Sequence, residues 1–180
     1  MQQLTLLICI NSEGRGTMLN VKEKTIQVDE ILDEFSNMVY RLAFSRTKNL
    51  HDAQDITQDV FIKLMSYKKN FESDEHLKSW LIRVTINSSK NLLTSAWFRK
   101  TAPLEDNLVT HIKEDSEVYK YVLDLPRKYR TVIHLFYYEG FKTQEIADIL
   151  EVKEGTIRSQ LNRARNILRD NIKEEDFDVF

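Results

Sequence analysis

Hydrogen-bond donors suited to binding nucleic acid are concentrated near the C-terminal end of this sequence. Residues 156–169 contain four arginines and no acidic residue. Donors spaced along one face of a helix can bind phosphate oxygens and the edges of bases. The outward donors at this spacing are Arg158, Ser159, Asn162 and Arg163. This pattern predicts a DNA-binding surface, and a solvated basic face on an ordinary helical hairpin is the competing interpretation.

Two short amphipathic helices would position these donors. The apolar residues of the first are Ile146, Ala147, Ile149 and Leu150. Those of the second are Ile157, Leu161, Ala164 and Leu168. Each apolar face is too narrow to be stable alone, so the two helices should pack across the break at residues 151–153. This arrangement is a helix-turn-helix, whose second helix normally enters the major groove of DNA.

A second basic segment lies at residues 77–104, which contain no acidic residue. Its aromatic and donor side chains include Trp80, Arg83, Asn87, Lys90 and Asn91. Cationic grooves with aromatic contacts are typical of proteins that bind single-stranded DNA. The spacing of Trp80 favours a core position for its ring. The segment as a whole predicts electrostatic contact with the DNA backbone.

An acidic stripe occurs at helical spacing earlier in the chain. Its members are Asp52, Asp55, Gln58 and Asp59. The stripe lacks the oxygen-rich loop that calcium requires. It is either a solvated face or a docking face for a basic partner, and periodicity alone favours the solvated face.

Catalysis has little support in the sequence. The dipeptide His51-Asp52 is similar to one in metal-dependent phosphohydrolases, which need further His and Asp ligands. The other histidines stand in unlike contexts, and no glycine-rich phosphate loop occurs. We therefore expect no enzyme activity, no metal and no cofactor, with a helical phosphohydrolase as a remote alternative.

Composition indicates a folded helical protein. The 180 residues are 42% hydrophobic and 30% charged, with only 4 glycines and 2 prolines. The single cysteine, Cys9, excludes an internal disulfide and fits a reducing compartment, so we expect a cytoplasmic protein. No apolar run is long enough for membrane insertion. We predict an all-α fold of two small helical domains joined by a linker, with no convincing strand.

Periodicity and charge place the boundaries of these domains. The predicted domains cover residues 26–96 and 117–172, joined by a linker at 97–116 that loses periodicity and changes from basic to acidic. Residues 173–180 read as an acidic tail. Residues 1–25 read as a leader, and translation that begins at Met18 is an alternative to a genuine, poorly ordered leader. Mass spectrometry of the native N-terminus would decide between these two.

Two blocks of the sequence together carry a family pattern. The first block is DAQDITQDVFIKLM (52–65) followed by LKSWLIRVTINSSKNLL (77–93). The second is LPRKYRTVIHLFYYEGFKTQEIADILEVKEGTIRSQLNRARNILR (125–169). Together they resemble the extracytoplasmic-function (ECF) type of bacterial RNA polymerase sigma factor. The second block alone would fit a generic, stand-alone helix-turn-helix regulator, and the first makes the resemblance specific. The sequence departs from the family pattern in its acidic loop at 72–75 and in Leu77, where many relatives have an aromatic residue.

The resemblance implies partners and a role for each surface. The partners would be core RNA polymerase, promoter DNA and an anti-sigma factor. Polymerase would be bound by Asp52, Asp55, Gln58 and Asp59. The minus-ten element would be bound by Lys78, Trp80, Arg83, Asn87, Lys90 and Asn91, with a flipped base held by the loop at 70–76. The minus-thirty-five element would be bound by Lys153, Thr156, Arg158, Ser159, Asn162 and Arg163.

Overall fold

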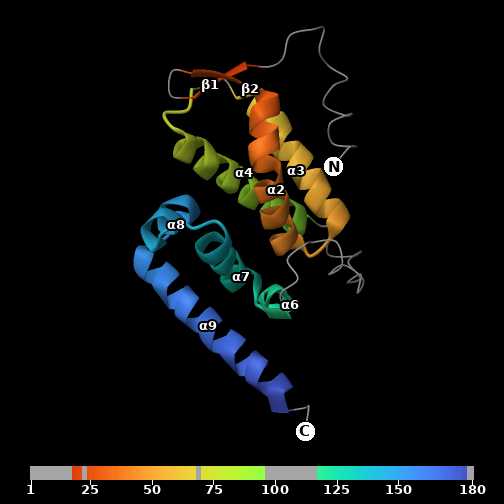
Figure 1. Ribbon diagram of the computed structural model, residues 1–180, viewed down its shortest axis with the longest axis vertical. Coiled ribbons are helices and arrows are strands. Elements are labelled where there is room, and N and C mark those ends of the chain that lie inside the picture. Colours follow the sequence, from red (N-terminus) through yellow and green to blue (C-terminus); the bar gives the residue numbers. More distant parts are fainter. Residues whose placement is uncertain (1–17, 22–23, 68–69, 96–116, 178–180) are drawn as a thin grey trace.

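The computed structural model describes residues 18–21, 24–67, 70–95 and 117–177 (Figure 1). The predicted linker at 97–116 and most of the predicted leader lie outside these residues. Helices form two bodies, which confirms the predicted all-α class with two helical units. We call residues 18–95 the N-terminal body and residues 117–177 the C-terminal body.

Three helices make up most of the N-terminal body: α2 (Val28–Thr47), α3 (Leu50–Met65) and α4 (Asp74–Thr94). Each of the three packs against the other two. Side-chain caps set where two of them begin. Asn49 accepts a hydrogen bond from the backbone N–H of Asp52 at 3.0 Å, and Ser73 accepts one from His76 at 3.1 Å. Their apolar faces meet in a core that includes Leu42, Val60 and Leu81, all fully buried.

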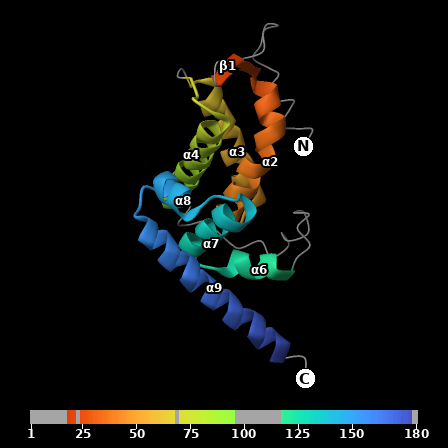
Figure 2. The ribbon, with the colours of Figure 1, turned by 60° about the vertical axis from the view of Figure 1, so that its left-hand side comes forward.

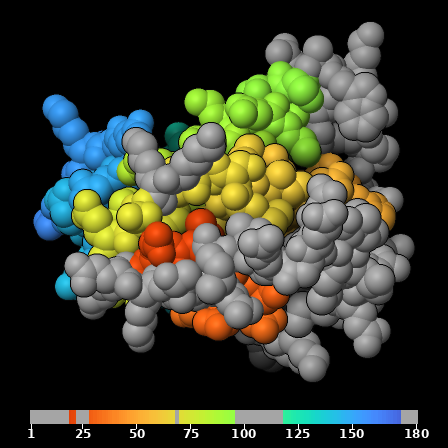
Figure 3. Space-filling view, turned by 90° about the horizontal axis from the view of Figure 1, so that it is seen from above, coloured from red at the N-terminus to blue at the C-terminus, as the bar shows by residue number. Residues whose placement is uncertain are grey.

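A small antiparallel hairpin, which the sequence did not predict, covers one end of these helices. Its strands are β1 (Met18–Val21) and β2 (Lys24–Gln27), in the register Met18↔Gln27 and Val21↔Lys24. The backbone N–H of Phe71 donates to the backbone carbonyl of Asn20 at 2.9 Å. Figure 3 shows β1 beside the segment that precedes α4. The hairpin begins within the predicted leader at 1–25 and ends two residues beyond it, and a chain starting at Met18 would keep both strands.

The hairpin should contribute to stability through Val21, which is 1% exposed. We expect Val21→Ala to lower the free energy of unfolding by about 1–3 kcal/mol, because it removes buried methyl groups and leaves a cavity. Urea unfolding would measure this. Val118→Ala is the matched control, since Val118 is 47% exposed. Equal losses in the two variants would show that the hairpin does not pack on the core in solution.

The C-terminal body consists of α6 (Glu117–Asp124), α7 (Arg127–Ile133), the π-helical turn η3 (His134–Tyr138), α8 (Thr143–Leu150) and α9 (Glu154–Phe177). Helix α9 packs on α6, α7 and α8, and its last turns extend away from the rest of the molecule (Figure 1). The helix continues to Phe177, beyond the point at which the sequence predicts a tail.

The two bodies are in contact along two pairs of helices. Helix α2 packs on α7, and α4 packs on α8 (Figure 2). Among the described residues, no helix has both the length and the apolar character that a membrane crossing requires.

Candidate nucleic-acid interface

Helices α8 and α9 form the predicted helix-turn-helix. Ile146 of α8 and Ile157 of α9 are both fully buried between them. The turn passes through Glu151, which ends α8 in the left-handed conformation with φ 56°. The hydroxyl of Thr143 donates to the carboxylate of Glu154 at 2.5 Å, which ties together the first residues of the two helices.

The N-terminal half of α9 exposes the predicted donors together. The exposed set, including one residue of the turn, is Lys153, Thr156, Arg158, Ser159, Asn162 and Arg163. Arg158 is 69% exposed and donates to Glu154 at 2.9 Å. Hydrogen bonds from Thr143 and Arg158 lower the pKa of the Glu154 carboxyl. The arrangement leaves the guanidinium at the surface, where it can exchange Glu154 for another acceptor.

A surface hollow of about 430 Å³ is lined by residues of both α7 and α9. Its lining includes Lys128 and Tyr129 of α7 beside Ser159 and Arg163 of α9. A hydrogen bond with Arg163, together with the charge of Lys128, lowers the pKa of the Tyr129 phenol. The positive lining suits a phosphate group. The sequence analysis missed Lys128 and Tyr129, although the basic run Arg127-Lys128 just after Pro126 was a signal.

The basic face of α4 divides into two groups. Lys78 donates to the backbone oxygen of Glu139 at 3.1 Å, and Arg83 donates to that of Asp148 at 3.0 Å. These two predicted DNA contacts are therefore engaged by the C-terminal body. The second group consists of predicted DNA contacts that are exposed: Asn87, Lys90 and Asn91. Trp80 belongs to neither group.

Trp80 belongs to an aromatic cluster next to residues 70–76. The predicted loop is shorter than this range, because Ser73 caps α4 and residues 74–76 form its first turn. Its ring centroid lies 4.9 Å from that of Tyr67 and 5.7 Å from that of Phe71. The ring is partly buried against the core. This packing agrees with the core position that the spacing of Trp80 favoured, and the residue as a whole is only partly buried.

The acidic stripe lies on α3, where Asp55 is exposed and Asp52, Gln58 and Asp59 are half-buried. Burial and the neighbouring charge of Asp55 raise the pKa of the Asp52 carboxyl.

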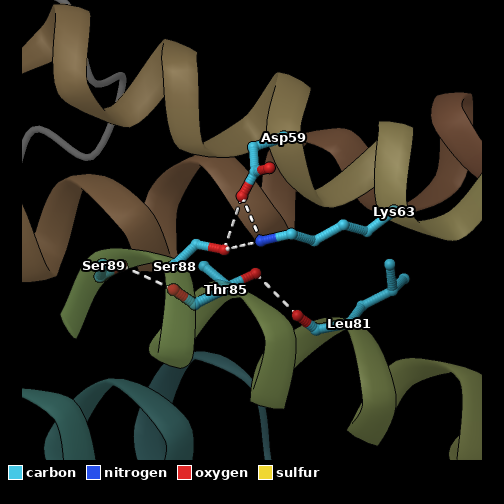
Figure 4. Close-up of polar contacts among 6 residues, drawn as sticks. All are labelled: Asp59, Lys63, Leu81, Thr85, Ser88 and Ser89. Carbon is cyan, nitrogen blue, oxygen red and sulfur yellow. Dashed lines mark hydrogen bonds and ion pairs between the residues drawn. The ribbon is translucent and has the colours of Figure 1, made fainter. Parts of the chain in front are cut away.

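Asp59, unlike Asp55, already has partners within the molecule. Its carboxylate accepts from Lys63 at 2.6 Å and from Ser88 of α4 at 2.7 Å (Figure 4). Asp59 thus joins α3 to α4 and pairs with Lys63, which leaves Asp55 as the more accessible acidic group of the stripe.

An exposed apolar side chain continues the stripe. Ile62 is 55% exposed and lies one helical turn beyond Gln58 and two turns beyond Asp55. Large apolar groups at the surface, framed by polar ones, often mark protein-binding sites. The sequence analysis missed Ile62, because an apolar residue in an amphipathic helix is normally assigned to the core.

Glu139 lies where the two bodies meet, with its side chain 6% exposed. Its carboxylate lies 3.4 Å from Nε2 of His134, 3.6 Å from Arg41 and 3.7 Å from Lys78. Burial alone raises the pKa of this carboxyl, but His134, Lys78 and Arg41 together outweigh burial and lower it. The ionised carboxylate is thus stabilised in the folded protein.

This lowered pKa predicts pH-dependent stability. The stabilisation is fully present above the ordinary pKa of 4.5 and is lost as pH falls through the lower pKa of the folded state. We expect Glu139→Gln to lower the free energy of unfolding by about 1–3 kcal/mol at pH 7, and by less at pH 3. Urea titrations at both pH values would measure the difference. Glu34→Gln, at an exposed position of α2, is the control. An equal loss from Glu139→Gln at both pH values would contradict the assignment.

Metal chemistry has no support in the described part of the chain. No three His, Cys, Asp or Glu side chains there come together as a site for a metal ion. Among the described residues, His51 and Asp52 therefore have none of the further ligands that the phosphohydrolase alternative requires.

Two models of one protein family match the chain, in the order that the resemblance predicts. Residues 31–99 match Sigma-70 region 2, and residues 116–168 match Sigma-70, region 4. The first range contains α2, α3 and α4, and the second contains the helix-turn-helix.

Individual relatives agree with these matches. The chain is 29% identical to "RNA polymerase sigma factor SigV" of Bacillus subtilis (strain 168), over 76% of this chain and 86% of that one. It is 34% identical to "ECF RNA polymerase sigma factor SigE" of Mycolicibacterium smegmatis, over 79% of this chain and 60% of that one. The sigma factor RpoE of Bartonella quintana, solved with the anti-sigma factor NepR, has the same fold, with a TM-score of 0.65 and 23% identity over 81% of this chain and 96% of that one. The chain therefore belongs to the sigma-70 family of RNA polymerase sigma factors, and to its ECF type.

Proposed function

We propose that this chain directs RNA polymerase to promoters by presenting three surfaces: α9 and α4 for DNA, and α3 for core polymerase. One observation supports the proposal most strongly. The chain matches both region 2 and region 4, and α9 of region 4 carries an exposed row of hydrogen-bond donors. A stand-alone helix-turn-helix regulator would need only the C-terminal body and would have no use for region 2. The polymerase would supply catalysis, and the chain would have no active site of its own.

The recognition surface of α9 would bind the minus-thirty-five element. Arg158, Ser159, Asn162 and Arg163 face outward together and would contact base edges in the major groove. Lys153 and Thr156, at the start of the helix, would bind phosphates. Lys128 and Tyr129 extend this surface onto α7, where the hollow beside Arg163 would receive the DNA backbone.

The basic face of α4 would bind the minus-ten element. Asn87, Lys90 and Asn91 are exposed and would contact the DNA backbone, joined by Lys78 and Arg83 when these leave their partners in the C-terminal body. The aromatic surface of Trp80 and the segment at 70–76, which includes the first turn of α4, would hold an unstacked base. Each such base recovers about 1–3 kcal/mol, which offsets part of the cost of opening base pairs.

The outer face of α3 would dock on core polymerase. Asp55 and Gln58 supply acceptors for a basic partner surface, and Ile62 supplies apolar area between polar neighbours. Asp52 would contribute from the same face, and Asp59 would hold α3 against α4.

Control by a protein partner is part of this proposal. One solved structure with the same fold is a sigma factor in complex with an anti-sigma factor. We expect such a partner for this chain too, acting in the cytoplasm, where core polymerase and promoter DNA are found.

Chemical footprinting of the assembled polymerase would test the proposal. Genomic fragments retained by core polymerase only when this chain is present should show two protected blocks, near the minus-ten and minus-thirty-five positions. Protection of a single block, equally strong without core polymerase, would contradict it.

A further inference from the structure

Backbone contacts join the N-terminal hairpin to residues 70–73, which lead into α4. The backbone N–H of Phe71 donates to the carbonyl of Asn20, and Val21 forms a parallel bridge with Phe71. At its other end the hairpin is continuous with α2, since β2 ends at Gln27 and α2 begins at the next residue (Figure 1). The hairpin therefore ties residues 70–73 to the start of α2.

Phe71 is the anchor of this segment. Its side chain is 2% exposed, and its ring centroid lies 4.9 Å from that of Tyr67 and 5.5 Å from that of His76. The ring also meets Trp80 edge-on, and Trp80 carries the aromatic surface proposed for an unstacked base. Phe71 is thus fixed twice, through its backbone by the hairpin and through its ring by the aromatic cluster.

The residues on either side of Phe71 remain at the surface. Asn70 and Glu72 are exposed, while Phe71 between them is buried. Neighbouring side chains of an extended backbone point to opposite faces, so an anchor at Phe71 sets the direction of both. Asn20 of β1 adds a direct contact, because its Nδ2 donates to Oδ1 of Asn70 at 3.4 Å. The hairpin therefore orients an exposed amide at the start of the segment proposed to hold a base.

The hairpin lies outside the match to region 2, which begins at residue 31. Membership of the family therefore implies no role for it. Burial of Val21 accounts for a contribution to stability. An exposed hydrogen bond of 3.4 Å adds little to stability, so the contact between Asn20 and Asn70 points to the orientation of Asn70 rather than to folding.

We propose that the hairpin is a positioning element for the minus-ten element, in which Asn20 and Val21 hold residues 70–73 in the orientation that selects a base. The inference rests on the proposed role of this segment in holding an unstacked base. A site held rigidly by its neighbours penalises the wrong base, whereas a loosened segment adapts to it. Loss of the tether should therefore reduce the preference for the correct base more than it reduces DNA binding in general.

Hydrogen exchange on the full chain would test the tether itself. The amide of Phe71 should be protected in the wild type, because it donates to the carbonyl of Asn20. Val21→Ala should make this amide exchange about tenfold faster, because it removes buried methyl groups that hold the hairpin in place. Val39→Ala is the matched control at a buried valine of α2, and it should leave the exchange of Phe71 close to wild type. An unprotected Phe71 amide in the wild type would overturn the proposal.

Binding of fork DNA by the assembled polymerase would test the consequence. The probe is a fork with a single-stranded minus-ten segment from a mapped promoter, in which each base is replaced in turn. Asn20→Ala and Asn70→Ala should each lower the preference for the correct base at one position by about 2- to 10-fold. Val21→Ala should have a similar effect, and Val39→Ala none. The double variant of Asn20 and Asn70 should lose no more than Asn70→Ala alone, because Asn20 acts through Asn70. Additive losses would show that Asn20 contacts DNA by itself, and would overturn the positioning role.

A further control separates the positioning role from the base-binding role of the segment. Asn37→Ala, at an exposed asparagine of α2 outside the proposed DNA surfaces, should keep the wild-type preference. Binding to core polymerase should be unchanged in all variants. Loss of preference in Asn70→Ala but in neither Asn20→Ala nor Val21→Ala would overturn the positioning role and leave the base-binding segment intact. Wild-type preference in every variant, Trp80→Ala included, would overturn both.

Discussion

Replacing Asp55 with arginine is expected to abolish binding to core RNA polymerase while the fold remains intact. The side chain is exposed on α3, so the substitution removes no buried contact. At a docking face for a basic surface it places like charges together, which costs several kcal/mol and is enough to remove a complex of ordinary affinity. A pull-down with purified core polymerase would measure the loss, and circular dichroism would confirm the fold.

The matched control for this variant is Asp170→Arg, which makes the same charge change at an exposed position of α9. It should bind core polymerase as the wild type does. A normal pull-down with Asp55→Arg would refute the assignment of α3 as the docking face. A weaker effect is expected from Ile62→Ala, because it removes apolar area and introduces no repulsion.

Loss of either Arg158 or Arg163 should weaken promoter recognition by about 1–3 kcal/mol, or about 5- to 150-fold, if that residue contacts a base edge. Both residues are exposed on the same half of α9. Arg158 must exchange its hydrogen bond with Glu154 for one to DNA, whereas Arg163 lies beside the hollow with Tyr129. Binding of the assembled polymerase to promoter variants would measure each effect.

Arg169→Ala is the matched control on the same helix, since Arg169 is exposed three turns beyond Arg158. It removes one positive charge outside the proposed surface and should leave the promoter response close to wild type. Polymerase binding should be unchanged in all three variants. Promoter responses equal to wild type in both Arg158→Ala and Arg163→Ala would contradict base contact by this face.

The helical fold could be predicted because its signals are local. Apolar residues recur at helical spacing through α2, α3, α8 and α9, and the break at Glu151 marks the turn between the last two. The hairpin could not be predicted in the same way. Its strands have four residues each, too few for alternation to be visible, and the buried Val21 forms a backbone bridge with Phe71, fifty residues away in sequence.

The residues of the candidate surfaces differ in the same way: those on one helix could be predicted, and those brought together by packing between helices could not. Residues that share one helix face, such as Arg158 and Asn162, could be grouped from spacing alone. Glu139 could not, because its partners Arg41 and Lys78 come from helices distant in sequence. The hollow beside Tyr129 likewise depends on how α7 packs on α9.

The central claim is best tested by transcription in vitro, with purified core polymerase and fragmented genomic DNA, with and without this chain. The account predicts discrete new transcripts that depend on the chain, with start sites preceded by both promoter elements. No stimulation, together with tight binding of the chain alone to duplex DNA, would contradict the account and indicate a stand-alone helix-turn-helix regulator.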